Sequence, residues 1–190
     1  AGQPLVFEAY RDPIKTFETN SNGTLNVLEA CNRVNSVKTL VCITSDKSYK
    51  NINTTRPYKE TDTIMGDDPY SASKSSAEII INSYQKTLKR DKLGIVVARA
   101  GNVIGGGDLS ENRIIPDLVK SILIKKKIIL RNPQATRPWQ YVLDPLHGYL
   151  ILAMKSYVNH KKFTGAYNFG PENSQTINVL GVCKNFLKDF

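Results

Sequence analysis

The stretch KTLVCITSDK, Lys38 to Lys47, joins a short apolar run to a polar triplet. From Lys38 to Thr44 the run is continuous and rich in β-branched residues, a pattern that predicts a strand buried on both faces of a parallel sheet. Ser45, Asp46 and Lys47 follow it. Ligands of open parallel sheets bind beyond the carboxyl ends of the strands, so this triplet lies where a binding site is expected.

Helical and strand patterns alternate on both sides of this stretch. Apolar residues recur at helical spacing from Pro13 to Val34, apart from a weak spot at 20–23, and again from Ser71 to Arg90. The segment GIVVARA, 94–100, repeats the pattern of a buried strand. The order helix, strand, helix, strand predicts an α/β fold with a doubly wound parallel sheet.

The composition of the sequence changes after residue 100, where the glycine-rich segment GNVIGGGD begins. We therefore place a domain boundary near residue 101, between a sheet-building part, 1–100, and a part richer in loops, 101–190, that could wrap a ligand. The elements expected in the second part are a helix at 114–125, a strand at 128–130, a helix at 143–158, a strand at 166–170 and a helix at 177–187.

The composition argues against several classes of protein. No apolar run approaches the roughly 20 residues of a membrane helix, and the first residues carry no signal-peptide pattern, so we expect a cytoplasmic protein without a membrane segment. The three cysteines form no C-x-x-C pair and the two histidines stand 13 residues apart, so no metal site is expected. The net charge of +9 favours an anionic partner. Because no nucleic-acid-binding signature accompanies it, a phosphate-bearing small molecule is preferred to nucleic acid.

A Y-x-x-x-K pattern, Tyr70 and Lys74, opens the second helical segment. Residues at i and i+4 lie on one helical face, and an ammonium beside a phenol favours the phenolate, so the pair could act as a base near neutral pH. On its own, the pattern more often marks a packed tyrosine beside a surface lysine. The triplet after the strand, taken alone, is equally compatible with a polar turn that holds an exposed ion pair.

Six segments, in order along residues 2–171, give these patterns a context: TSDKSY, DPYSASKSSAE, RAGNVIGGGD, IIPDLV, RNPQATRPWQYVLDPLHGYL and YNFGP. In them the sequence resembles the extended short-chain dehydrogenase/reductase family, and within it the CDP-glucose 4,6-dehydratases. The resemblance implies a Rossmann-like fold, NAD as the cofactor, and CDP-glucose or a similar nucleotide sugar as the substrate. It also implies a place in the synthesis of surface polysaccharides such as the O-antigen of lipopolysaccharide.

The resemblance assigns catalytic roles to both motifs. Tyr70, assisted by Lys74, would take the proton of the sugar 4-hydroxyl while hydride leaves C4 for the nicotinamide, and Ser45 would hydrogen-bond that hydroxyl. Asp46 would then protonate the departing 6-hydroxyl and Lys47 would remove the C5 proton, before the hydride returns to C6. A lysine rather than a glutamate at position 47 is what separates this interpretation from a dTDP-glucose dehydratase.

The resemblance also implies binding residues. Those that would contact NAD are Tyr70, Lys74 and Asn20. Those that would hold the sugar or its diphosphate are Asn102, Arg113 and Arg137, and a guanidinium fork suits phosphate oxygens. Trp139 would form one side of the nucleotide site, although a role as a packing anchor between loop and helix is equally compatible with the sequence.

One part of the family pattern is missing. A complete member opens with a strand and a glycine-rich turn that receive the NAD pyrophosphate, whereas this sequence starts at AGQPLV and stops in a helical pattern at Phe190. We therefore expect a fragment, with 1–100 as the C-terminal half of an NAD-binding domain and 101–190 as mainly a substrate-binding region interleaved with it. The isolated chain is then expected to bind NAD weakly, if at all, and to show negligible turnover.

Alternatives stay open. The complete protein could be an epimerase, a decarboxylase, or a dehydratase of dTDP- or GDP-sugars on the same scaffold. The chain could also be a truncated, non-enzymatic protein that binds an anionic sugar nucleotide. If complete, the protein is expected to be a homodimer, with the helices at 13–34 and 71–90 as candidate interface elements.

Overall fold

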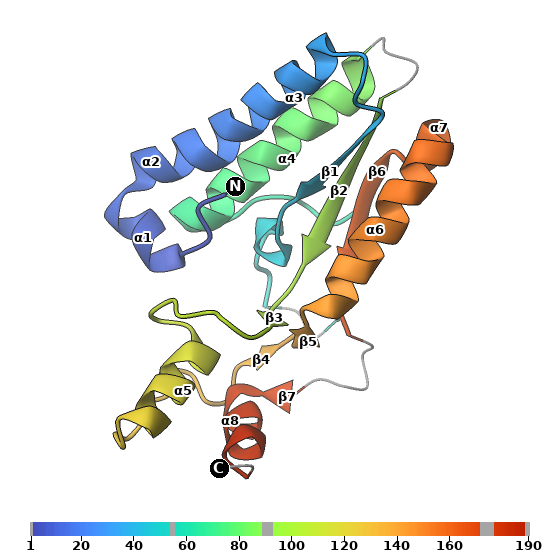
Figure 1. The fold of residues 1–190 in the computed structure, drawn as a ribbon. Helices are drawn as coiled ribbons and strands as arrows, with labels where there is room; N and C mark the ends of the chain where they lie inside the picture. Colours follow the sequence, from blue (N-terminus) through green and yellow to red (C-terminus); the bar gives the residue numbers. More distant parts are fainter. Residues whose placement is uncertain (1, 54–55, 89–92, 172–176, 189–190) are drawn as a thin grey trace. The chain divides into compact units, whose positions relative to one another are not determined.

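The computed structural model describes residues 2–53, 56–88, 93–171 and 177–188, which form two compact units (Figure 1). The first unit combines Ala1–Ala100 with Leu146–Phe169, and the second combines Gly101–Pro145 with Gly170–Phe190. The chain therefore returns to the first unit after it has entered the second. The assignment of the two parts to cofactor and substrate stays a prediction.

Most of the regular structure belongs to the first unit. Its elements, in chain order, are α1 (Val6–Arg11), α2 (Pro13–Phe17), the π-helical turn η1 (Glu18–Asn22), α3 (Gly23–Arg33), β1 (Thr39–Ile43), the 3₁₀ turn η2 (Asp46–Ser48), α4 (Pro69–Thr87), β2 (Gly94–Ala100), α6 (Leu143–Val158, which belongs to this unit from Leu146 on), α7 (His160–Phe163) and β6 (Gly165–Phe169).

The strands of the first unit form a parallel sheet in the order β1-β2-β6. In its register Thr39 pairs with Gly94 and Val96 pairs with Gly165. Helix α4 connects β1 to β2, and α6 lies between β2 and β6 in the chain. The predicted α/β fold with a parallel sheet is confirmed.

Alternate side chains of β2 build two separate cores. Ile95 and Val97 pack with Leu28 of α3 and Ile81 of α4. Val96 and Ala98 pack with Leu152 of α6 on the opposite face. Figure 1 shows the same arrangement, with α3 and α4 on one side of the sheet and α6 on the other. All seven residues of β2 are buried, because helices cover both faces of this central strand.

The long helix predicted from Pro13 to Val34 is present, but η1 interrupts it at Glu18–Asn22. There Asn20 Nδ2 donates to Ser73 Oγ at 2.9 Å, and Ser21 Oγ donates to Ser73 O at 3.1 Å. A π turn inserts one residue into a helix. The inserted residue is consistent with the orientation of two adjacent polar side chains, Asn20 and Ser21, which both point toward α4.

Three predictions about individual elements are corrected. β1 was expected to be buried on both faces, but it is the edge strand of the described sheet and Ile43 is 47% exposed. The strand predicted at 128–130 does not form, and Ile129 is 89% exposed, because an apolar run needs a paired neighbour to become a strand. Helix α4 ends at Thr87, short of Arg90, which lies outside the described residues.

The second unit contains short elements. They are β3 (Val103–Ile104), α5 (Ile114–Leu123), β4 (Thr136–Arg137), β5 (Gln140–Tyr141), β7 (Ile177–Asn178) and α8 (Val179–Leu187). β3 pairs with β5 in parallel, and β4 pairs with β7 in antiparallel orientation. Strands of two residues carry no readable periodicity, which is why the sequence did not indicate them. The helix predicted at 177–187 is corrected at its start, because Ile177 and Asn178 form β7 and the helix begins at Val179.

Among the described helices, none combines the length and the apolar character that a membrane crossing needs.

The core of the first unit predicts a contrast between two isoleucines of α4. Ile81 is 0% exposed and Ile79 is 63% exposed. Ile81→Ala should lower the free energy of unfolding by about 2–5 kcal/mol, because it removes core contacts and leaves a cavity. The matched control, Ile79→Ala, should change it by less than about 0.5 kcal/mol. Urea denaturation followed by circular dichroism measures both, and equal losses would contradict the orientation of α4.

Candidate functional site

The start of α4 fixes the position of the predicted base. The Asp68 carboxylate accepts hydrogen bonds from the backbone N–H groups of Tyr70 and Ser71, both at 3.0 Å, and Pro69 occupies the first helical position. Aspartate as the N-cap and proline at the first turn are preferred for helix initiation. The sequence DPYS thus places Tyr70 in the first turn, with Lys74 one turn later on the same face.

The triplet after β1 folds into the turn η2. Ser45 caps this turn, since the N–H of Lys47 donates to Ser45 Oγ at 3.2 Å, and Ser45 Oγ donates to Asp46 Oδ1 at 3.1 Å. Lys47 Nζ lies 5.8 Å from the centroid of the Tyr70 ring. The structure therefore brings together the two motifs that are separate in the sequence, at the carboxyl end of a parallel strand.

Lys74 occupies a half-buried position beside the same strand end. Its ammonium donates to Ile43 O at 3.4 Å. Burial lowers the pKa of Lys74 from its ordinary value, and the negative charge of Glu78 opposes that shift. A Cβ placed on Gly2 would lie 3.3 Å from Lys74 Nζ and 3.1 Å from Asn20 Oδ1, so the backbone at residue 2 passes close to both side chains.

The side-chain amide of Asn20 is hydrogen-bonded within the protein through both its nitrogen and its oxygen. Its Nδ2 donates to Gln3 O at 3.1 Å and to Ser73 Oγ at 2.9 Å, and its Oδ1 accepts from the N–H of Gln3 at 2.8 Å. Both amide hydrogens are thereby used. Asn20 holds the segment at residues 2–3 against α4, and its direct contact with NAD stays a prediction.

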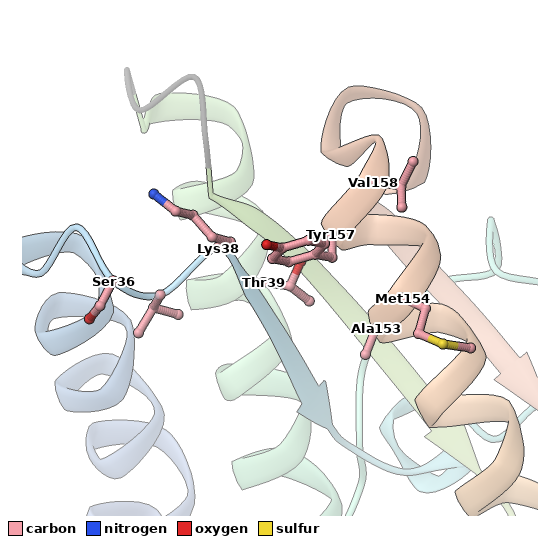
Figure 2. Close-up of a pocket in the computed structure, with 8 residues that line it drawn as sticks. Ser36, Lys38, Thr39, Ala153, Met154, Tyr157 and Val158 are labelled. Atoms are coloured by element: carbon pink, nitrogen blue, oxygen red, sulfur yellow. The ribbon is translucent and has the colours of Figure 1, made fainter.

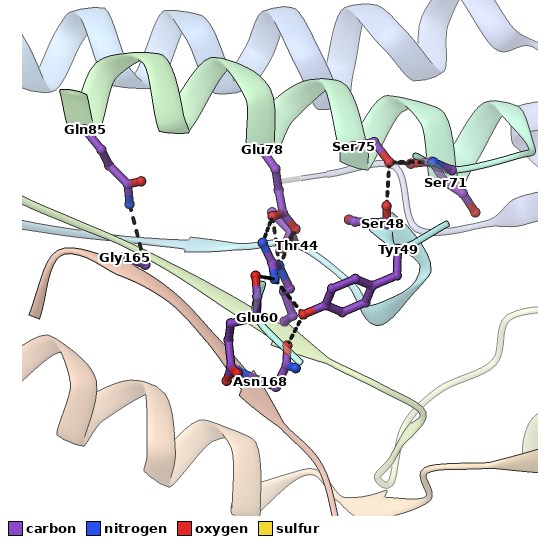
Figure 3. A network of polar contacts seen from close by, with 12 residues as sticks. Thr44, Ser48, Tyr49, Glu60, Ser71, Ser75, Glu78, Gln85, Gly165 and Asn168 are labelled. Atoms are coloured by element: carbon purple, nitrogen blue, oxygen red, sulfur yellow. Dashed lines mark hydrogen bonds and ion pairs between the residues drawn. The ribbon is translucent and has the colours of Figure 1, made fainter. Parts of the chain in front are cut away.

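Sequence reasoning missed a buried polar cluster in the first unit (Figure 3). Arg99 of β2 and Glu78 of α4 form an ion pair with side chains 6% and 4% exposed, and Arg99 Nε lies 3.0 and 2.9 Å from the two carboxylate oxygens. Tyr49 Oη accepts from Arg99 Nη1 at 2.6 Å and donates to Asn168 Oδ1 at 2.7 Å. The signal was available, because an arginine inside the otherwise apolar strand GIVVARA needs a buried partner.

The predicted substrate-binding residues all belong to the second unit. Arg113 Nη1 pairs with Asp108 Oδ2 at 3.0 Å, and Arg137 Nη1 donates to Thr136 O at 2.9 Å. Burial alone raises the pKa of Asp108, but hydrogen bonds from Ser110 and Arg113 outweigh it and lower the pKa. Arg113 is the N-cap residue of α5 and Arg137 belongs to β4, and their contact with a phosphate stays a prediction.

Two further residues of the second unit hold its short strands in place. Trp139 Nε1 donates to Ile177 O at 3.1 Å and so ties the loop after β4 to β7. This contact agrees with the role of Trp139 as a packing anchor. The role of Trp139 in lining a nucleotide site stays a prediction. Asn102 O accepts from the N–H of Gln140 at 3.0 Å, next to the β3–β5 pair.

An open hollow of about 580 Å³ lies in the first unit where the start of β1 meets the end of α6, and Figure 2 shows the residues that line it. Much of its lining is apolar and includes Val37, Ala153 and Met154. None of the predicted site residues lines it. Across the described ranges, no group of three or more histidine, cysteine, aspartate or glutamate side chains is arranged to hold a metal ion.

A family model, described as the NAD dependent epimerase/dehydratase family, matches residues 1–170. The chain belongs to this family. Membership confirms NAD as the cofactor class, and the parallel sheet with helices on both faces is the part of the family fold that the described residues show.

Known members resemble the chain to different degrees. It is 40% identical over 188 residues to a CDP-glucose 4,6-dehydratase from Salmonella typhimurium, an alignment that covers 95% of the chain and 52% of that enzyme. It is 27% identical to a dTDP-D-glucose 4,6-dehydratase from Dictyostelium discoideum, covering 96% of the chain and 42% of that protein. The chain spans about half the length of these relatives.

Solved structures of the family share the fold. A dTDP-glucose 4,6-dehydratase double mutant from Streptomyces venezuelae with NAD bound matches with a TM-score of 0.83 at 19% identity, over 99% of this chain and 55% of that one. A dTDP-glucose 4,6-dehydratase from Bacillus anthracis in complex with NAD matches with a TM-score of 0.80 at 25% identity, over 93% and 54%.

The buried ion pair predicts a contrast between two arginines. Arg99→Ala leaves the Glu78 carboxylate buried without its cation and should lower the free energy of unfolding by about 3–5 kcal/mol. Arg33 pairs with Glu29 at 3.6 Å with side chains 79% and 39% exposed. Arg33→Ala should therefore cost only about 0.2–1 kcal/mol. Differential scanning calorimetry compares the two, and similar small losses would show that the Arg99–Glu78 pair does not hold the unit together.

Proposed function

We propose that the complete protein to which this chain belongs is a nucleotide-sugar 4,6-dehydratase that acts on CDP-glucose. The observation that carries the proposal is the juxtaposition of an acid, an amine and a phenol at one strand end, where Lys47 Nζ lies 5.8 Å from the Tyr70 ring and Asp46 precedes Lys47 in the chain. An epimerase needs only the phenol and its lysine. The 40% identity to a CDP-glucose 4,6-dehydratase supports the nucleotide.

The residues around Lys74 suit the cofactor. An ammonium carries three N–H donors, and one of them is directed to Ile43 O, so others can serve hydroxyl groups of a ligand. The backbone at Gly2 packs close to Asn20 and Lys74, so a side chain at residue 2 would reduce the space beside these two side chains. Tyr70 and Lys74 would hold NAD here, with Asn20 fixing the adjacent segment. NAD, when bound, would supply a hydride acceptor that later returns the hydride.

In this proposal, side chains of the protein would carry out the proton transfers. Tyr70 would accept the proton of the sugar 4-hydroxyl, since the positive charge of Lys74 favours its phenolate. Ser45 would orient that hydroxyl, which requires it to exchange its hydrogen bond with Asp46 for one to the sugar. Once C4 is a ketone, Lys47 would remove the acidified C5 proton and Asp46 would protonate the 6-hydroxyl as water leaves.

The second unit would hold the diphosphate of the substrate. Arg113 and Arg137 carry guanidinium groups that match phosphate oxygens, and the guanidinium of Arg113 forms an ion pair with Asp108 in this structure. Asn102 and Trp139 would contribute contacts to the sugar and to the nucleotide. Homodimer formation and a cytoplasmic location stay predictions of this proposal.

The proposal is tested with the complete natural protein that contains this chain, supplied with NAD and CDP-glucose. Asp46→Asn removes the acid and should slow water loss by about 10²–10⁴-fold, the usual contribution of a general acid. Oxidation at C4 should persist and be visible as NADH absorbance. Mass spectrometry follows the product that has lost one water.

Asp67→Asn is the matched control, because Asp67 is an exposed carboxylate in the loop before α4. It should leave product formation unchanged. If CDP-glucose is only inverted at C4, and Asp46→Asn has no effect on that inversion, the protein is an epimerase and the proposal fails. If dTDP-glucose is dehydrated faster than CDP-glucose, only the assignment of the nucleotide fails.

A further inference from the structure

One face of α4 holds the triplet from both sides. On the N-terminal side of the triplet, Thr44 Oγ1 donates to Glu78 Oε1 at 2.7 Å. On its C-terminal side, Ser75 Oγ donates to Ser48 O at 2.9 Å. Ser75 and Glu78 are three residues apart on the helix, so they are neighbours on its surface. The same helix carries Tyr70 and Lys74, so these contacts tie the residues that flank the triplet to the helix that carries the second motif.

Glu78 is itself held rigidly. Its carboxylate receives Arg99 Nε and is almost completely buried, and Arg99 reaches Tyr49 Oη at 2.6 Å. Tyr49 is bonded to Asn168 of β6. The contact to Thr44 is therefore anchored in α4, β2 and β6 at once (Figure 3).

The strand does not need the hydroxyl of Thr44 for its own pairing. The backbone N–H of Thr44 donates to Ala98 O at 2.9 Å, which continues the β1–β2 ladder by one residue. The side-chain hydrogen bond is an additional constraint that acts one residue before Ser45. What it fixes beyond the sheet is the direction in which the triplet leaves β1.

We propose that Thr44, Glu78 and Arg99 are positioning residues that set the placement of Asp46 and Lys47 relative to Tyr70. The inference rests on the proposed function, because it assigns these residues to the geometry of that site. Their own groups make no contact with substrate in this scheme. They act through the strand end, and reacting groups lose rate steeply when they are displaced by about 1 Å.

The test uses Thr44→Val in the complete protein, because valine keeps the shape of threonine and replaces its hydroxyl with a methyl group. We expect kcat for CDP-glucose dehydration to fall by about 10–10²-fold, with KM changed by less than about twofold, because the interaction acts on the reacting geometry and not on uniform binding. Thr44→Ser keeps the hydroxyl and should restore kcat to within about threefold of the wild-type value.

Thr39→Val is the matched control. Thr39 stands at the other end of β1, where its Oγ1 donates to Ser156 Oγ at 3.3 Å, far along the strand from the triplet. This variant should keep kcat and show a melting temperature like that of Thr44→Val. If Thr44→Val keeps the wild-type kcat, or if both variants lose activity in parallel with their folded fraction, the positioning role is overturned.

A second readout separates this inference from the proposed function, because it needs no turnover. The Lys47 side chain approaches the Tyr70 ring, so its methylene protons should carry a ring-current shift in NMR spectra of selectively labelled protein. Thr44→Val should reduce that shift, while Thr44→Ser and Thr39→Val should preserve it. An unchanged shift in Thr44→Val overturns the inference even if the enzyme dehydrates CDP-glucose. A wild-type protein that fails to dehydrate CDP-glucose but shows the expected shift changes overturns only the proposed function.

Discussion

The ion pair between Arg99 and Glu78 is the constraint on which the candidate site depends. Two opposite charges, both nearly excluded from water, have to remain together, since separating them would leave an uncompensated charge in the interior. Arg99 belongs to the central strand and Glu78 to the helix that carries Tyr70. The pair therefore fixes where α4 lies along the sheet. This in turn sets the position of the Tyr70 phenol relative to the end of β1.

Around this pair, the chemistry is divided between rigid and adaptable parts. Tyr70 and Lys74 lie on a capped helix, which gives them little freedom. The triplet Ser45–Asp46–Lys47 forms a short turn, and Lys47 is exposed. The proposed mechanism would need a fixed base for the first proton transfer and side chains that can reorient for the elimination. The hydrogen bond between Ser45 and Asp46 marks the contact that a bound sugar would have to replace.

Much of the fold and part of the site were predictable, for reasons that differ between elements. Strand β2 and helix α6 were predicted at their observed bounds, because the run GIVVARA is apolar apart from Arg99 and α6 is rich in apolar residues. The exposure of β1 and the missing strand at 128–130 were not predictable, because they depend on which neighbours pair with them. The polar cluster at Glu78, Thr44 and Tyr49 was also missed, since its members lie far apart in the sequence.

The sequence by itself determined the alternation of helices and strands, the polar triplet at a strand end and the tyrosine–lysine pair, because these follow from local periodicity and spacing. Only the tertiary structure decided that Lys47 faces Tyr70, that Asn20 is occupied by Gln3 and Ser73, and that Arg99 pairs with Glu78. The physical reason is that buried polar groups need partners, and their partners are selected by the packing of helices on the sheet.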